Sequence, residues 1–433
     1  MIRVLLHEMR RGEAGKVALL MAAVGSWYLV SEDTATSDWI GWWTQASIKV
    51  QVFGVIVMGS LMSAAAAWSA GRARRTRTSA WADTTPRGGW SQALLLWAAA
   101  WLPALAAYAL MAAIAFWRTA AVSEVTDPVW TPLLLGAVMI GFQIAAGVAA
   151  GSLLPSRITA PAAGVLWYLV FVVFAFVPES PLASLFPAID EHWDATFRPH
   201  TTRLLVATAW CGAAALTLLA LPALVRRPVV SPRLYAVVPV ALAAVVAGGV
   251  LLTFRAPVPD PFWAVRAQQP EEPACVTQGR TKACLWPADR HLMPQVEAAT
   301  LKVDQALGPL TGLNRSFYQT GLRPSGPYSA ELPVYRPVVD TATLTAAMLD
   351  ASLPQPASGC EPYPLKELGG LPDTFLFQAV IHSRAGAGAP YYGDEFAATL
   401  EAVLKAPAAD RDAWISAAAG EIGACRPVPP LPR

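Results

Sequence analysis

The sequence predicts a membrane protein: an all-α helical bundle of about seven spans, followed by an α+β or mainly α extracytoplasmic domain. Three observations predict this class. Charged residues make up only 14% of the 433 residues, well below the roughly 25% of soluble domains. Seven apolar stretches reach or approach the roughly 20 residues that a membrane-spanning helix needs. The C-terminal part has no such stretch and carries most of the cysteines.

Residues 1–16 are predicted to form a helix that lies in the membrane interface. Ile2, Leu5, Leu6 and Met9 fall on one helical face, whereas the basic residues mostly lie elsewhere. This amphipathic pattern is typical of helices that rest in the headgroup region.

Six predicted spans form a core over residues 17–227, and a seventh occupies residues 228–254. The hydropathy criterion selects Val17–Val30, Ile48–Ala70, Ala93–Trp117, Leu133–Leu154, Ala160–Val177, Leu204–Val225 and Ala236–Thr253. The first stretch is short, but acidic residues precede it and "VSEDTATSDW" follows it. These neighbours argue against a cleaved signal peptide.

The loops between the spans alternate in charge. One set is basic and contains Arg3, Arg10, Arg11, Lys16, the arginines from Arg72 to Arg87, Arg157, Arg226, Arg227 and Arg233. The alternate set holds most of the carboxylates. By the positive-inside rule, the N-terminus is cytoplasmic, the C-terminal domain is extracytoplasmic, and the protein is multi-pass in the cell membrane. The partner expected from composition is membrane lipid, and no nucleic acid is expected from a net charge of +2.

The predicted spans contain almost no titratable residue in their interiors, which argues against an ion-coupled transporter. The segment "GEAGKV" lacks the first glycine and the Ser/Thr of a phosphate loop, so no nucleotide site is expected. His291 and His382 lie far apart in the sequence, and no catalytic triad can be argued from spacing. We therefore expect a non-enzyme without a metal, cofactor or catalytic residue of its own.

Small residues recur every four positions on two of the predicted spans. Gly59, Ser63 and Ala67 do so on the second span, and Gly147 and Gly151 on the fourth. Such ladders let helix backbones approach closely, within the bundle or across a dimer. Accidental spacing in an alanine-rich chain is the alternative.

The segment "GRARRTRTSAWADTTPRGGW" is basic and lies between the second and third spans. Thr78 or Ser79 can cap a short helix, and Asp83 can support its first turn. Pro86 and the two following glycines would end that helix, and Trp81 would present an apolar ring. Two interpretations stay open: a positive-inside stop signal with a solvated turn, or a lever that a cytoplasmic partner pushes.

This layout resembles the type-2 exporter class of ATP-binding-cassette permeases over roughly Met1–Arg227. The resemblance rests on the interfacial first helix, the basic loop, and the amphipathic "SPLASLFPAIDEHWDATFR" before the sixth span. In that class the loop is a coupling helix that docks on the ATPase. The resemblance thus implies an ATPase-coupling loop formed by Arg77, Thr78, Ser79, Ala80, Trp81, Asp83, Thr84, Thr85 and Pro86.

The resemblance also implies partners. They are an ATP-binding subunit, which holds ATP and Mg, and a second permease copy or paralogue that completes a dimer. A permease of this class usually ends after its sixth span, whereas this chain continues outward, as in actinobacterial permeases with a C-terminal extracytoplasmic domain. The expected function is the permease subunit of an ATP-driven exporter. The alternative is a membrane-anchored extracytoplasmic binding or sensor protein without transport activity.

Residues 255–272 are predicted to form a proline-rich stalk, and residues 273–433 the extracytoplasmic domain. "CVTQGRTKACLWP" indicates a hairpin around a Gly–Arg turn, and "PYSAELPVYRPVV" indicates an irregular strand. Helical spacing predicts helices in "HLMPQVEAATLKVDQALGPL", "DTATLTAAMLDASL", "DEFAATLEAVLKA" and "DRDAWISAAAGEIGAC".

Four of the five cysteines, Cys275, Cys284, Cys360 and Cys425, fall in the segment predicted to be external, where the environment is oxidising. Sequence alone allows three pairings. We favour Cys275–Cys284, which closes a short loop, and Cys360–Cys425. Free buried thiols are the alternative.

Overall fold

The structure is a computed structural model that describes most of the chain. The described residues are 2–32, 37, 39–76, 89–123, 128–176, 197–226, 232–255, 263–265, 273–319, 322, 329–332, 341–352, 367–368, 371–386, 394–424, 426 and 429.

Helices make up the N-terminal part of the chain, which we call the bundle. They are α1 (Ile2–Arg11), α2 (Glu13–Ser31), α3 (Trp43–Phe53), the π-helix η1 (Gly54–Met58), α4 (Gly59–Arg75), α6 (Gly89–Ala120), α7 (Thr131–Leu153), α8 (Thr159–Phe176), α9 (Thr201–Arg226) and α10 (Pro232–Arg255). α3, η1 and α4 follow one another without a break, so they form one long helix. Each of the seven predicted apolar stretches coincides with a described helix or with this continuous one.

Five helices are long and apolar enough to cross a membrane, which confirms the helical class. They are Glu13–Ser31, Trp43–Arg75, Trp90–Ala120, Thr131–Leu153 and Thr201–Pro222. The other two predicted spans fall in α8 and α10, where the described apolar stretches, Thr159–Val173 and Val240–Leu251, are shorter. A count of seven spans therefore stays a prediction.

Contacts between loop and helix ends show that successive helices of the bundle run in opposite directions. Arg118 Nη2 donates to the Glu32 carbonyl (2.7 Å), which joins the ends of α6 and α2. Ser47 Oγ donates to the Val129 carbonyl (2.7 Å), which joins the beginnings of α3 and α7. Strands β1 (Phe197–Pro199) and β2 (Trp263–Val265) pair, so α9 begins where α10 ends. We call the end of the bundle that carries these contacts and the β1–β2 pair the domain end.

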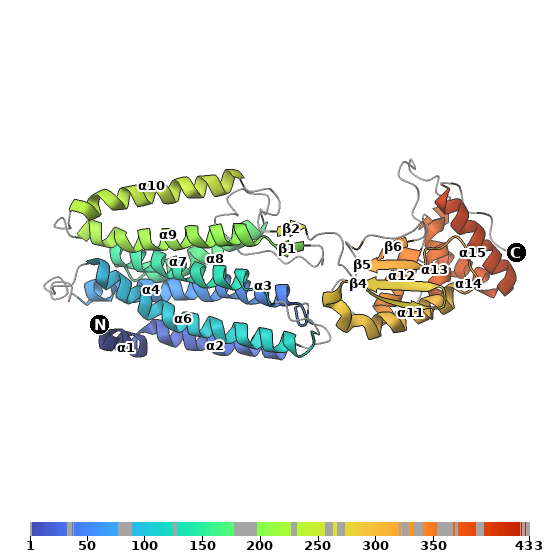
Figure 1. Ribbon diagram of the computed structural model, residues 1–433, viewed down its shortest axis with the longest axis horizontal. Coiled ribbons are helices and arrows are strands. Elements are labelled where there is room, and N and C mark those ends of the chain that lie inside the picture. Colours follow the sequence, from blue (N-terminus) through green and yellow to red (C-terminus); the bar gives the residue numbers. More distant parts are fainter. Residues whose placement is uncertain are drawn as a thin grey trace.

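The opposite end carries α1, the end of α4 and the turn between α7 and α8, and we call it the basic end. Figure 1 shows α1 there and the C-terminal domain beyond the domain end. Arg72, Arg74 and Arg75 end α4, and Arg157 lies in the α7–α8 turn. The described arginines of the predicted cytoplasmic loops thus gather at one end.

α7 is the central helix of the bundle and is buried along most of its length. An apolar helix without a polar face is the kind that packs in a core. Two tryptophans of α6 are fixed to it: Trp97 Nε1 donates to the Gly141 carbonyl (2.8 Å), and Trp101 Nε1 to the Ala137 carbonyl (3.0 Å). α4 packs along another side of α7.

The C-terminal domain combines a four-stranded sheet with helices. Strands β3 (Ala274–Gln278) and β4 (Thr281–Leu285) are antiparallel, and β5 (Ser316–Gln319) and β6 (Ser329–Leu332) continue the sheet in parallel in the order β3-β4-β5-β6. The other elements are η3 (Pro287–Leu292), α11 (Met293–Leu307), α12 (Thr341–Ser352), β7 (Glu367–Leu368), β8 (Leu371–Pro372), α13 (Asp373–Arg384), α14 (Asp394–Lys405) and α15 (Ala408–Gly423).

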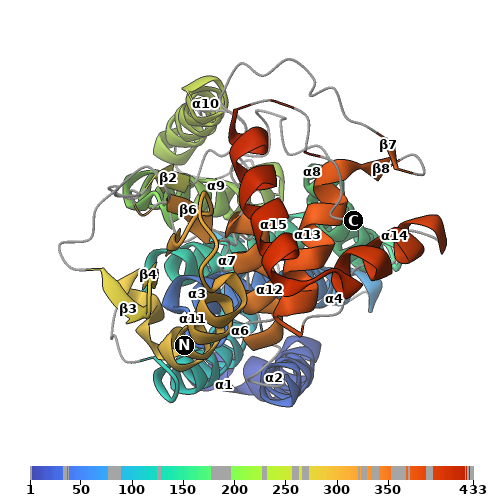
Figure 2. The same cartoon turned by 90° about the vertical axis from the view of Figure 1, so that its right-hand side faces the viewer.

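The bundle and the C-terminal domain each have a main hydrophobic core of their own. The larger core includes α7 and its neighbours, from Ala14 to Leu219. The C-terminal core joins β4 and β5 to α11, α12, α13, α14 and α15. Viewed along the long axis, the C-terminal domain lies in front of the domain end (Figure 2). β2 is the described strand of the predicted stalk, and it pairs with β1 at that end.

Candidate functional site

The predicted coupling loop lies outside the described residues. Its members are Arg77, Thr78, Ser79, Ala80, Trp81, Asp83, Thr84, Thr85 and Pro86. The external stretch before the sixth span also lies outside them, apart from Phe197 and Arg198 in β1. The described part of this region is the helix end from which the loop continues, and the candidate site is therefore the long helix Trp43–Arg75 with its two ends.

Arg72 links the end of α4 to the first helix. Its Nη2 lies 3.0 Å from both carboxylate oxygens of Glu8. Half of the Arg72 side chain is exposed, so the pair contributes at most about 1 kcal/mol to stability. Its main effect is geometric, because it fixes α1 beside the residues that lead into the basic loop. Arginines also suit the last turn of a helix, where the carbonyl dipoles point outward.

Arg75 turns back along α4 instead of extending away from it. Its Nη2 donates to the carbonyl of Trp68, seven residues earlier, and its guanidinium carbon lies 4.1 Å from the centre of the Trp68 ring. Gly71 leaves the space for this arrangement, because a Cβ there would lie 2.4 Å from Arg75 Nη1. Of the arginines in the last turn of α4, Arg72 therefore contacts α1, and Arg75 packs against α4 itself.

The two predicted small-residue ladders face each other across the α4–α7 interface. An ideal Cβ on Gly147 would lie 2.2 Å from the Ser63 carbonyl oxygen, and one on Gly151 would lie 2.1 Å from the Ala67 carbonyl oxygen. At the next step, a Cβ on Gly59 would lie 1.6 Å from Gln143 Oε1. The structure brings these residues together within one chain, at backbone-to-backbone distance.

A π-helix lies at the centre of the long helix and faces Gln143, the polar side chain that the sequence places at depth. Gln143 Nε2 donates to the Val55 carbonyl (3.0 Å) within η1. Gly54 leaves room for the Tyr108 ring, which would lie 2.5 Å from a Cβ at that position. The π-turn is absent from the sequence prediction, although π-turns often occur at functional positions. A glycine at each end, Gly54 and Gly59, is the available sequence signal.

Three buried polar atoms in this region have no hydrogen-bond partner within the described part of the chain. They are Gln143 Oε1, Ser63 Oγ and the Tyr108 hydroxyl. A buried polar atom without a partner costs about 1–3 kcal/mol. The α4–α7 interface is thus closely packed, but some of its buried polar atoms lack hydrogen bonds among the described residues.

Lys49 lies further from the start of its helix than the predicted span implies. The predicted span begins at Ile48, but α3 begins at Trp43, so six residues, or about 9 Å of helix, precede Lys49. Its Nζ lies 3.8 Å from Glu32 Oε1 and 5.6 Å from the centre of the Tyr28 ring. Lys49 thus belongs to a charged cluster at the domain end.

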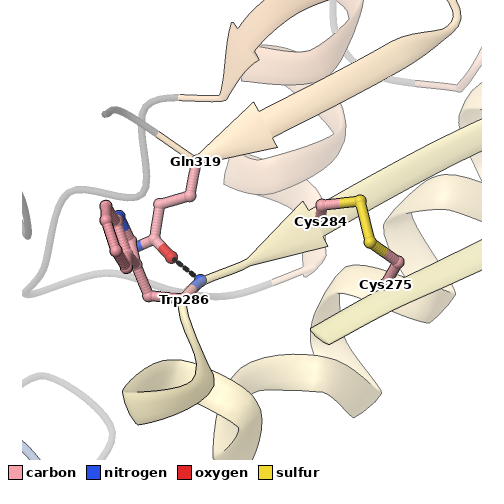
Figure 3. Close-up of a disulfide and its surroundings, with 4 residues drawn as sticks. All are labelled: Cys275, Cys284, Trp286 and Gln319. Carbon is pink, nitrogen blue, oxygen red and sulfur yellow. Dashed lines mark hydrogen bonds between the residues drawn. A yellow bond between two sulfur atoms is a disulfide. The ribbon is translucent and has the colours of Figure 1, made fainter. Parts of the chain in front are cut away.

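The C-terminal domain contacts the residue that immediately precedes the long helix. Trp42 Nε1 donates to Asp289 Oδ1, and Gln319 Nε2 donates to the other carboxylate oxygen (2.7 Å). Gln319 Oε1 in turn accepts a hydrogen bond from the Trp286 amide (2.9 Å) (Figure 3). A chain of hydrogen bonds therefore runs from Trp42 through Asp289 in η3 and Gln319 at the end of β5 to Trp286, which follows β4.

The predicted Cys275–Cys284 disulfide is confirmed. The two residues lie directly opposite each other in the β3–β4 register. Cys284 lies two residues before Trp286 in the sequence (Figure 3). Cys211 is a free, buried cysteine in α9. Cys360 and Cys425 lie outside the described residues, so their pairing stays a prediction.

The hairpin turn explains why these cysteines meet. Gly279 has a φ of +58°, which favours glycine, and Arg280 completes the two-residue turn. Asp304 holds the turn, since its Oδ1 accepts hydrogen bonds from the Arg280 amide (3.0 Å) and Thr281 Oγ1 (2.9 Å).

Burial, reinforced by repulsion from Arg280, lowers the pKa of the neighbouring Arg315.

Comparison with protein-family models, with curated proteins and with solved structures finds no significant match to this chain.

Proposed function

We propose that this chain is the membrane-spanning permease subunit of an ATP-driven transporter, acting in export together with a separate ATPase. The observation that carries the proposal is the continuous helix Trp43–Arg75. Its 33 residues span about 50 Å at 1.5 Å per residue, which exceeds the thickness of a membrane. One end leads into the basic loop Arg77–Pro86, and the other contacts the C-terminal domain through Trp42.

In this proposal the ATPase moves the loop, and the loop moves α4. The Glu8–Arg72 pair makes α1 part of the same inner assembly. Among the described bundle residues, no Asp, Glu, Lys, Arg or His is fully buried. Ion-coupled transporters usually need such a residue to carry the coupled charge, which favours force that arrives from a partner.

The partners follow from the same reasoning and from the resemblance. ATP and Mg are bound by the ATPase subunit and not by this chain. Two ATPase copies need two levers, so a second permease copy or a paralogue completes a dimer. The N-terminus and the basic end are cytoplasmic, and the C-terminal domain is extracytoplasmic. Labelling that places position 75 on the same side of the membrane as the C-terminal domain would contradict this orientation.

The experiment that tests the proposal is copurification with an ATPase in mild detergent, followed by ATPase assays. We expect a nucleotide-binding subunit to be retained. Trp81→Glu and Pro86→Leu should uncouple ATP hydrolysis from transport while the chain still folds. Trp130→Glu is the matched control, because Trp130 is an exposed tryptophan at the domain end. Normal transport by the Trp81 and Pro86 variants would reject the lever.

A membrane-anchored extracytoplasmic binding or sensor protein is the second candidate function. The observation that favours it is the separate hydrophobic core of the C-terminal domain, since such a domain can bind a ligand without any movement of the bundle. This function needs no ATPase. Reproducible absence of a nucleotide-binding subunit from the purified protein would therefore support it over transport.

A further inference from the structure

We propose that the basic end binds the headgroup of an anionic phospholipid, between the end of α4 and the α7–α8 turn, through Arg75 and Arg157. The proposal rests on the orientation given above, in which this end faces the inner leaflet, but it does not depend on an ATPase partner.

Arg75 is already held in the position that a headgroup would need. Its guanidinium group is fixed by the Trp68 carbonyl and lies over the Trp68 ring at 4.1 Å. The side chain therefore lies against the flank of α4, pointing back toward the membrane. A charge that is held in place loses less conformational entropy on binding than a free arginine side chain.

Within the described part of the chain, no carboxylate neutralises the positive charge of Arg75 and Arg157. The end of α7 lies beside the end of α4, because a Cβ on Gly71 would lie 3.2 Å from the Gly151 carbonyl oxygen, and Arg157 follows in the α7–α8 turn. Glu8 compensates Arg72, but no carboxylate among the described residues pairs with Arg75 or Arg157. Two arginines on neighbouring segments without a carboxylate partner create a positive potential that favours a bound anion.

Apolar side chains are exposed beside these charges. Trp68 is 40% exposed, and Leu154 and Ile158, in the α7–α8 turn, are 66% and 74% exposed. α8 packs on α4, because a Cβ on Gly164 would lie 3.2 Å from both the Ala64 Cβ and the Ser60 carbonyl oxygen. This packing brings the turn before α8 to the side of α4 that carries Trp68.

The combination of charge and apolar surface favours a lipid over a soluble partner. An anionic phospholipid offers a phosphate for the arginines and an acyl chain for the tryptophan and the aliphatic residues. Clusters of basic residues next to a spanning helix attract anionic lipids, and each basic residue contributes about 1 kcal/mol to the binding free energy. An acidic surface of the ATPase is the competing occupant, and the test below separates the two.

The experiment measures binding of dioleoyl phosphatidylglycerol and dioleoyl phosphatidylcholine to the full chain in neutral detergent by native mass spectrometry. We expect phosphatidylglycerol to bind more tightly. Arg75→Gln with Arg157→Gln should weaken its binding about thirtyfold, since each arginine contributes a factor of about five. Arg72→Gln with Glu8→Gln is the matched control and should change binding less than twofold, because the two variants together remove an ion pair without changing the net charge.

A double variant that keeps the charge, Arg75→Lys with Arg157→Lys, guards against an effect of misfolding and should keep the preference for phosphatidylglycerol. Unchanged phosphatidylglycerol binding by the double Gln variant would overturn the proposal. So would equally strong competition by soluble glycerol phosphate, because the apolar residues would then play no part. If the double Gln variant loses ATPase binding but keeps its lipid binding, the surface belongs to the ATPase instead.

Discussion

Trp42 and Asp289 lie 247 positions apart in the sequence, and the indole Nε1 of the first donates a hydrogen bond to the carboxylate of the second. Asp289 is only 1% exposed. A buried carboxylate is costly unless hydrogen bonds compensate its charge. The contact is therefore a specific attachment of the C-terminal domain to the N-cap residue of the long helix.

Replacing Trp42 by phenylalanine should loosen this attachment. The variant keeps an aromatic ring but removes one donor from a buried carboxylate, at a cost of about 1–3 kcal/mol. We expect faster amide hydrogen exchange in η3, measured on the full chain in detergent. Trp27→Phe is the control, because Trp27 is 71% exposed on α2. Equal exchange rates in η3 for both variants would show that the bond does not hold the domain.

The Glu8–Arg72 pair should contribute a small but measurable coupling between α1 and α4. In a double-mutant cycle with Glu8→Gln and Arg72→Gln, we expect about 0.2–1 kcal/mol of coupling in the free energy of unfolding. The coupling should shrink as salt is added, since the pair is partly exposed. Glu13 and Lys16 form a comparable pair within one helix, so a cycle on them provides the control. A coupling that is absent at low salt would refute the link.

Hydropathy and loop charge were sufficient to locate the helices of the bundle, because both are properties of one segment at a time. The beginning of α3 was not found, because Thr44, Gln45, Ser47 and Lys49 make its first turns polar. Other segments supply partners for two of them: the Val129 carbonyl accepts from Ser47, and Glu32 lies beside Lys49. Such long-range partners cannot be read from the local sequence.

The same distinction applies to the candidate site. The ladder residues were visible at their four-residue spacing, but their partners were not, because pairing depends on how α4 and α7 cross. The π-helix was missed because its contact comes from Gln143, 88 residues after Val55. By contrast, Cys275–Cys284 was predictable, since a two-residue turn places its flanking positions opposite each other.

Removing the disulfide should destabilise the C-terminal domain. Cys275→Ser with Cys284→Ser opens a loop with a sequence separation of 9, and loop-closure entropy gives a cost of about 2–3 kcal/mol. We expect a lower midpoint of unfolding for this domain in the full chain, measured by pulse proteolysis.

The same variant also tests the second predicted disulfide. With Cys275 and Cys284 replaced, a reductant can act on a bridge between Cys360 and Cys425. A further loss of stability on reduction is expected if these two residues are paired. An unchanged midpoint would instead indicate free thiols at both positions.

Gly151→Ala should destabilise the bundle strongly for so small a change. The added methyl group would lie 2.1 Å from the Ala67 carbonyl oxygen, so α4 and α7 must move apart. Overpacking of this kind costs about 1–3 kcal/mol. The matched control is Gly212→Ala in α9, where the nearest atom would lie 3.8 Å from the new Cβ. We expect a lower thermal unfolding midpoint in detergent for Gly151→Ala but not for Gly212→Ala. Equal midpoints for the two variants would mean that the ladders do not set the distance between α4 and α7.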